Sequence, residues 1–153
     1  MAWRKVVEGI KKDGIRNAAQ TTIAPTGAIA TISGLEGYGC EPVFALAYVM
    51  RTHEGAEEGK EWRELAYESR LFREALGKAG LSERERSKIF ERVRETGSCQ
   101  EVPEVPKEMR RVFVVAGDVS GIEHVRMQAA LQRFVDNSIS KTINLPATAT
   151  LDD

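Results

Sequence analysis

Near the end of the chain, a polar turn joins an amphipathic helix to a short β-branched run. Residues 135–146 have the sequence VDNSISKTINLP. A solvated linker does not need β-branched residues, and an ordinary core strand does not carry so many side-chain hydroxyl and amide groups. The stretch therefore predicts a strand with hydrogen-bonding side chains at its entrance, where a substrate could be held.

The rest of the chain alternates between helical and extended patterns, which predicts an α/β fold. Apolar residues at helical spacing, or a capping box, predict helices over residues 3–13, 62–79, 82–95 and 120–135. Short apolar or β-branched runs predict strands over residues 18–23, 43–50 and 112–116 and within 135–146. A buried helix would also fit residues 43–50, and residues 53–60 form a polar connection.

Length and composition favour a single globular domain over residues 1–153. Hydrophobic residues make up 42% and charged residues 29%, which allows a core and argues against disorder. Lys+Arg 22 and Asp+Glu 23 give a net charge of −1, so we expect no nucleic-acid polymer and no membrane surface as a partner. The chain has neither an apolar signal core at its start nor a run of roughly 20 apolar residues, so the expected location is cytoplasmic.

A second polar turn, residues 22–30 with the sequence TIAPTGAIA, has the composition of a phosphate-binding turn. Pro25 fixes one backbone angle, and Gly27 allows a ligand to approach the backbone closely. If a helix begins at Gly27, its free amides and its dipole form an anion site, to which Thr26 adds a hydroxyl. Short Pro-Thr-Gly turns are also common as plain connections, so an ordinary turn stays open at this point.

Polar side chains also gather in the C-terminal stretch, at Ser138, Ser140, Lys141, Thr142 and Asn144. Ser140, Lys141 and Thr142 are candidates for lining a substrate mouth. The alternative is that the cluster hydrogen-bonds loop backbone and the end of the preceding helix, where the dipole favours Lys141.

The remaining polar residues give weaker indications. His53 and His124 have no partner at metal-ligand spacing, so no metal site is predicted, and His124 is expected to pack or to face solvent. Cys40 and Cys99 form no CxxC motif and are expected to be structural thiols. Glu41 follows a glycine-rich loop and could orient a ligand, but a carboxylate that stabilises the turn is the simpler interpretation. Spacing alone assigns no catalytic residue.

Four stretches, in this order, make the chain resemble the large catalytic subunit of ribonucleotide reductase, most closely the adenosylcobalamin-dependent class. They are Arg16–Ala18 with Thr22–Gly27, Gly39–Ala45 (GCEPVFA), His124–Ala130 (HVRMQAA) and Val135–Pro146. Each stretch is short, but the ordered set is specific and covers nearly the whole chain. The resemblance implies that the chain is a C-terminal segment of the family's ten-stranded α/β barrel.

The resemblance also implies a site and a chemistry. In that family the Pro-Thr-Gly loop holds the phosphates of a ribonucleotide substrate, which implies phosphate-binding roles for Ala24, Pro25, Thr26, Gly27, Ala28, Ile29 and Ala30. The implied reaction is radical reduction of the ribose 2′ position. Adenosylcobalamin generates a thiyl radical for it, and a cysteine pair supplies the electrons.

The chain departs from the family at two points. Ala28 and Ala30 stand where the family usually has hydroxyl residues, which removes two phosphate donors unless backbone amides replace them. The family's radical cysteine lies in an Asn-x-Cys-x-Glu loop, which neither Cys40 nor Cys99 matches. We therefore expect the chain to be inactive alone, and to need the remaining part of the barrel or self-association to cover its strand edges and apolar faces. A catalytically dead nucleotide-binding or regulatory relative, and a structural or interaction domain, are the alternatives.

Overall fold

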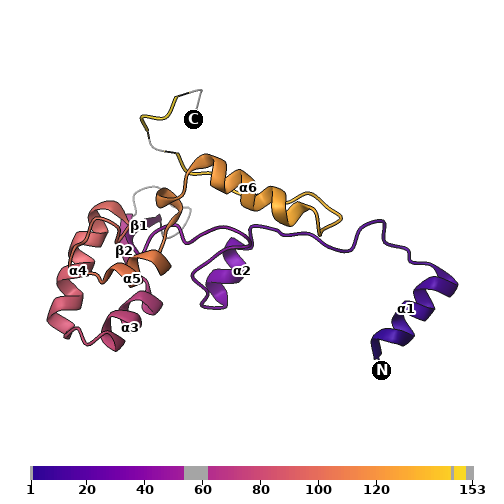
Figure 1. Ribbon diagram of the computed structural model, residues 1–153, viewed down its shortest axis with the longest axis horizontal. Helices are drawn as coiled ribbons and strands as arrows, with labels where there is room; N and C mark the ends of the chain where they lie inside the picture. Colours follow the sequence, from indigo (N-terminus) through magenta and orange to yellow (C-terminus); the bar gives the residue numbers. More distant parts are fainter. Residues whose placement is uncertain (1, 54–61, 146, 151–153) are drawn as a thin grey trace.

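The computed structural model of the protein describes residues 2–53, 62–145 and 147–150 (Figure 1). In chain order the elements are α1 (Ala2–Asp13), α2 (Gly27–Ile32), β1 (Ala47–His53), β2 (Trp62–Glu68), α3 (Arg70–Lys78), α4 (Glu83–Thr96), α5 (Lys107–Val112), the 3₁₀ turn η1 (Ala116–Asp118) and α6 (Gly121–Gln132). The described residues combine helices with one two-stranded sheet, in line with the predicted α/β class. They do not form a closed ten-stranded barrel.

The hairpin of β1 and β2 is antiparallel, with Ala47 opposite Glu68. β1 confirms the strand predicted over residues 43–50, although it begins later. β2 shows that the helix predicted over residues 62–79 was wrong in its first half. Residues 62–68 are extended because they pair with β1. Tyr67 stacks on Tyr48 of β1 with 4.7 Å between ring centroids, a cross-strand contact that the spacing of one segment does not reveal. Most of the predicted connection over residues 53–60 lies outside the described residues.

The hydrophobic core lies between this hairpin, α3 and α4. Its fully buried side chains include Leu46, Phe72, Leu76, Ile89, Phe90 and Val93. The capping box predicted at Ser82 is confirmed, since the Ser82 amide donates to the Glu85 carboxylate at 2.7 Å and the Glu85 amide donates to the Ser82 hydroxyl at 3.4 Å. α4 therefore begins where its local sequence predicts, and its apolar face completes the core.

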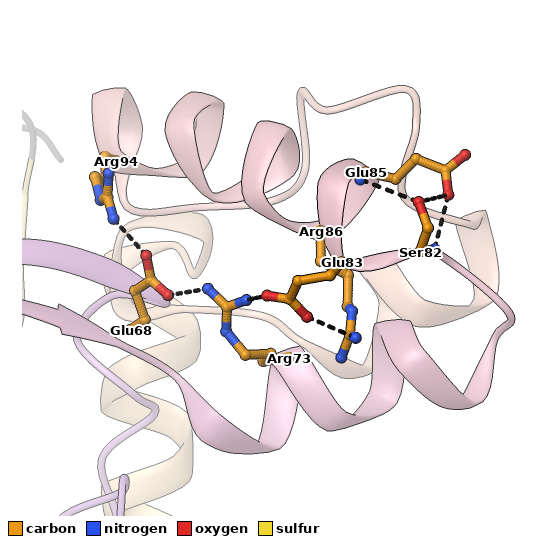
Figure 2. A network of polar contacts seen from close by, with 7 residues as sticks. All are labelled: Glu68, Arg73, Ser82, Glu83, Glu85, Arg86 and Arg94. Carbon is orange, nitrogen blue, oxygen red and sulfur yellow. Dashed lines mark hydrogen bonds and ion pairs between the residues drawn. The ribbon is translucent and has the colours of Figure 1, made fainter.

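A chain of ion pairs ties the end of β2 to both helices of this core (Figure 2). Glu68 accepts from Arg73 of α3 and from Arg94 of α4, and Arg73 also donates to Glu83. The Arg73 guanidinium lies 4.6 Å from the ring centroid of Phe90. Because Glu68 and Arg73 are less than a third exposed, this network is held more firmly than isolated surface pairs.

Three of the predicted strands do not form ladders. Residues 18–23 and 135–145 are extended or bent, and α5 occupies the region just before Val115, which makes a single parallel bridge with Val43. A strand requires a ladder of backbone hydrogen bonds. Residues 18–23 and 135–145 lie side by side, but among the described residues a single backbone hydrogen bond joins them, from the Asn137 amide to the Thr21 carbonyl at 3.0 Å.

The first and last helices confirm their predictions but leave apolar faces uncovered. α1 ends at Gly14, which has a positive φ of 76°, and projects away from the rest of the structure (Figure 1). Trp3 on α1 is 80% exposed, and Met127 on α6 is 52% exposed. At the start of α6 the Glu123 carboxylate accepts from the Ser120 amide and hydroxyl. No helix in the described ranges is both long and apolar enough to cross a bilayer.

Candidate functional site

The turn before α2 has an uncommon backbone conformation. Thr26, with φ 59° and ψ 21°, is the sole non-glycine residue at positive φ among the described residues. A β-branched residue rarely adopts this left-handed conformation, because its Cβ crowds the backbone. The Thr26 carbonyl accepts from the Ala30 amide at 2.8 Å, which starts the helix directly after the turn.

The first turn of α2 presents backbone donors without protein partners. The amides of Gly27, Ala28 and Ile29 precede the first intrahelical donor, and none of them donates a hydrogen bond to another described residue. Gly27 leaves open space, since a Cβ placed there would meet nothing within 4 Å. The arrangement can accept an anion from the solvent side.

The predicted phosphate-binding residues lie mostly at the surface. Ala24, Pro25, Ala28 and Ile29 are exposed, and Thr26 and Gly27 are half-buried. Ala30 differs, because it is buried and its amide is already donated to Thr26.

A glycine outside the predicted set supports this turn. Gly39 donates its amide to the Thr26 hydroxyl oxygen at 3.1 Å. Its φ is +50°, and a Cβ on Gly39 would lie 2.5 Å from the Ala24 carbonyl oxygen. Only glycine allows this approach. The sequence marked the loop as glycine-rich but carried no signal of its partner.

The C-terminal polar stretch lies beside the segment that leads into the turn. The Asp136 carboxylate accepts from the amides of Gln20 and Thr21 at 3.1 and 3.3 Å, and the Thr22 hydroxyl donates to the Ser138 carbonyl at 2.9 Å. These hydrogen bonds lower the pKa of Asp136. The largest effect comes from the Gln20 amide and the next from the Thr21 hydroxyl. The carboxylate therefore stays ionised and keeps the two segments together.

The residues predicted for a substrate mouth differ in their surroundings. The Lys141 ammonium contacts the Nδ1 atom of His124 and donates to the Thr142 carbonyl at 3.0 Å, so it is turned towards α6. Ser140 and Thr142 are exposed. The Thr142 amide donates to the Glu41 carboxylate at 2.7 Å, which joins the C-terminal stretch to the glycine-rich loop.

The histidine and the cysteines have structural surroundings. His124 is 1% exposed, and its Nε2 atom lies 3.1 Å from the Ala116 carbonyl, which agrees with the packing role expected for it. Cys99 is buried and donates to the Phe113 carbonyl at 3.4 Å, and burial raises its pKa to about 11. Cys40 is a half-buried free thiol beside Gly39. Within the described ranges, no three His, Cys, Asp or Glu side chains cluster closely enough to hold a metal ion.

An aromatic cavity of about 390 Å³ lies near the end of α2. Phe44, Tyr38, Tyr48 and Tyr67 contribute rings to its wall. Burial, with a smaller contribution from the nearby Glu36 carboxylate, raises the pKa of Tyr67 to about 12, so this phenol stays protonated. The cavity is mainly apolar and offers few groups that could orient a charged ligand.

Comparison with known proteins gives consistent matches along the chain. The family described as "Ribonucleotide reductase, barrel domain" matches residues 1–153. The chain is 38% identical over 151 residues to the vitamin B12-dependent ribonucleoside-diphosphate reductase of Thermoplasma acidophilum, covering 99% of this chain and 17% of that protein. The Mycobacterium tuberculosis protein of the same name is 38% identical over 138 residues, covering 90% and 18%. The vitamin B12-dependent ribonucleotide reductase of Streptomyces avermitilis is 32% identical over 155 residues, covering 99% and 15%. The chain thus spans less than a fifth of the length of each of these relatives.

Proposed function

Because the chain belongs to the ribonucleotide reductase barrel-domain family, we propose that it contributes the substrate phosphate-binding turn of a ribonucleotide reductase. The observation that carries the proposal is the turn at residues 24–30. Three amides without protein partners, those of Gly27, Ala28 and Ile29, stand beside the Thr26 hydroxyl at an open surface. Backbone donors at the start of a helix are well suited to phosphate oxygens.

The turn binds phosphate mainly through its backbone. The Thr26 oxygen accepts from Gly39, so its hydroxyl proton remains free to donate to a phosphate oxygen. Ala28 has no hydroxyl to add, but its amide is available. A hydrogen bond to a charged partner contributes about 1.5–3 kcal/mol, so each of these amides can replace a missing side-chain donor.

The chemistry we propose for the assembled enzyme is radical reduction of a ribonucleotide to a deoxyribonucleotide. This chain binds and orients the substrate, and the radical cysteine lies in another part of the enzyme. Bound adenosylcobalamin would supply the radical. Among the side chains that the structure describes, the histidine is His124, and both of its ring nitrogens are occupied by Lys141 and the Ala116 carbonyl. The described residues therefore offer no imidazole ligand for cobalt, and we assign no step to contact between this chain and the corrin.

We further propose that the remaining part of the barrel, or a second copy of the chain, covers the apolar faces of α1 and α6. Trp3 and Phe134 are each about 80% exposed, and Ile122 and Val125 on α6 are about half exposed. Apolar surfaces of this kind favour association. Sedimentation should show self-association, or binding to the complementary polypeptide. A compact monomer that binds neither would contradict this part of the proposal.

Calorimetry with ribonucleoside diphosphates and triphosphates tests the phosphate site. Gly27→Val places a side chain in the open space before the amides and should abolish binding by blocking the approach of the phosphate. A Cβ at this position would meet nothing within 4 Å, so we expect the turn to stay folded. Gly9→Val is the matched control, since Gly9 also has open space but lies on α1, away from the site. Absence of binding at millimolar nucleotide would leave only a structural or interaction role.

A catalytically dead nucleotide-binding or regulatory relative is the second candidate, and the missing hydroxyls at Ala28 and Ala30 favour it. The two candidates differ in turnover. The chain is mixed with a polypeptide that carries an Asn-x-Cys-x-Glu loop and with adenosylcobalamin. Deoxynucleotide formation then supports the reductase, whereas nucleotide binding without product supports the dead relative.

A further inference from the structure

Two polar segments that lie far apart in the sequence are joined at a single carboxylate. Glu41 accepts a hydrogen bond from the Thr142 amide at 2.7 Å across 101 positions of the chain. A carboxylate that only stabilised its own turn would bond within that turn. The turn of Glu41 is instead closed by its backbone, because the Glu41 amide donates to the Tyr38 carbonyl at 2.7 Å.

The same tight turn holds the phosphate-binding turn on its other side. Gly39 lies between Tyr38 and Glu41, donates to the Thr26 hydroxyl at 3.1 Å, and approaches the Ala24 carbonyl so closely that a Cβ would lie 2.5 Å away. A displacement of Glu41 therefore moves Gly39, and a displacement of Gly39 moves Thr26.

The segment that contains Thr142 is held in place by α6 and η1. Residues 138–145 are fixed through Lys141, whose ammonium contacts the ring of the buried His124. The other ring nitrogen of His124 lies 3.1 Å from the Ala116 carbonyl of η1. The Gln128 side chain of α6 also donates to the Ile139 carbonyl at 2.6 Å. The Thr142 amide is thus a fixed donor. Its hydrogen bond to Glu41 holds the glycine-rich loop in a fixed position relative to residues 138–145.

We propose that Glu41 is a positioning residue that couples residues 138–145 to the turn at residues 24–27, so that the two polar segments become ordered together. Glu41 does not touch the phosphate. It sets the position of Gly39, which in turn sets the orientation of the Thr26 hydroxyl and of the amides that follow. The inference rests on the proposed function only in taking this turn as the phosphate site.

Amide hydrogen exchange measured by NMR on the full chain tests the coupling without any ligand. Glu41→Ala removes the acceptor of the Thr142 amide, so this amide should exchange about tenfold faster, as loss of a charge-assisted hydrogen bond predicts. The Gly39 amide should also exchange about tenfold faster, because Glu41 no longer holds the loop that positions it. Glu41→Gln keeps an acceptor oxygen but not the charge, so exchange at both amides should lie between that of the wild type and that of Glu41→Ala. The Gly97 amide, which donates to the Val93 carbonyl at the end of α4, reports on the core and should not change. If Gly97 also accelerates, Glu41→Asp, shorter by one methylene, replaces the alanine variant.

Unchanged protection of Gly39 in a folded variant that has lost protection of Thr142 would overturn the proposal. A second arm adds inorganic pyrophosphate to the wild type and to Glu41→Ala. Coupling is reciprocal, so pyrophosphate should protect Gly39 and Thr142 together in the wild type and Gly39 alone in the variant. Protection of Thr142 in both proteins would contradict the role of Glu41. If the wild type binds no pyrophosphate, the proposed phosphate site fails, while the ligand-free exchange rates still decide the coupling.

Discussion

Substitution of Gly39 by alanine is the sharpest steric test of the proposed phosphate-binding turn. Alanine at a φ of +50° incurs the left-handed penalty of about 1–2 kcal/mol. Its Cβ would also lie 2.5 Å from the Ala24 carbonyl oxygen, so either Gly39 or the turn must move. In either case the hydrogen bond from Gly39 to Thr26 is lost, at a further cost of about 1 kcal/mol.

The sum, about 2–3 kcal/mol, is the free energy needed to restore the turn before phosphate can bind. Nucleotide affinity should therefore fall by about 30- to 150-fold, which calorimetry with a ribonucleoside diphosphate measures. Gly80→Ala is the matched control. Gly80 has a φ of +88° and no atom within 4 Å of its added Cβ, so it incurs the same penalty far from the site. It should lower the free energy of unfolding by about 1–2 kcal/mol and leave affinity unchanged. A folded Gly39→Ala protein that binds nucleotide within a factor of about two of the wild type would refute the reasoning.

Three further predictions concern Thr26, Arg73 and the two cysteines. Thr26→Val keeps the β-branched shape in the same left-handed conformation but removes the hydroxyl, so calorimetry should show affinity reduced by about fivefold or more, whereas Thr26→Ser should bind normally. Arg73→Met removes a guanidinium shared by two carboxylates and should lower the free energy of unfolding in urea by about 1–3 kcal/mol. Arg111→Met, at an exposed pair, should change it by less than about 0.5 kcal/mol, and equal effects would show that the network adds nothing. Iodoacetamide at pH 8 should label Cys40 and spare Cys99 until urea unfolds the chain, because burial raises the pKa of Cys99 to about 11. Peptide masses that show equal labelling of the two cysteines in the folded protein would contradict the burial of Cys99.

The features that could be predicted from the sequence are those decided within one or two turns of helix. The capping box of Ser82 and Glu85, the start of α6 at Ser120, and the end of α1 at Gly14 depend on neighbours three or four residues away. Their hydrogen bonds are local, so the spacing of residue types contains the information. The exposed turn before α2 was likewise predictable from Pro, Thr and Gly in succession.

The features that could not be predicted depend on partners distant in the sequence. β2 is a strand because it forms a ladder of hydrogen bonds with β1. Residues 18–23 are not a strand, because a single backbone hydrogen bond joins them to the extended segment beside them. The support of the turn by Gly39, the pairing of Asp136 with residues 20 and 21, and the bond from Thr142 to Glu41 join segments that are 13 to 116 positions apart. No periodicity or local motif encodes such pairs.

The candidate site depends on a different kind of interaction from the core. Phe72 and Phe90 belong to a closed apolar cluster that orders the hairpin, α3 and α4 whatever happens elsewhere. The turn at residues 24–30 and the segment before it are instead held by single polar bonds, each contributing about 1 kcal/mol, to the glycine-rich loop and to residues 136–138. Regions with few buried contacts open at low free-energy cost.

The apolar faces of α1 and α6 lie next along the chain to the two segments that these bonds join. A partner docked on those faces would add contacts beside these segments. The turn would then be more rigid before binding and would hold phosphate more tightly, because less ordering remains to be done on binding. Under the function we propose, assembly and phosphate affinity should therefore be linked through the same few hydrogen bonds.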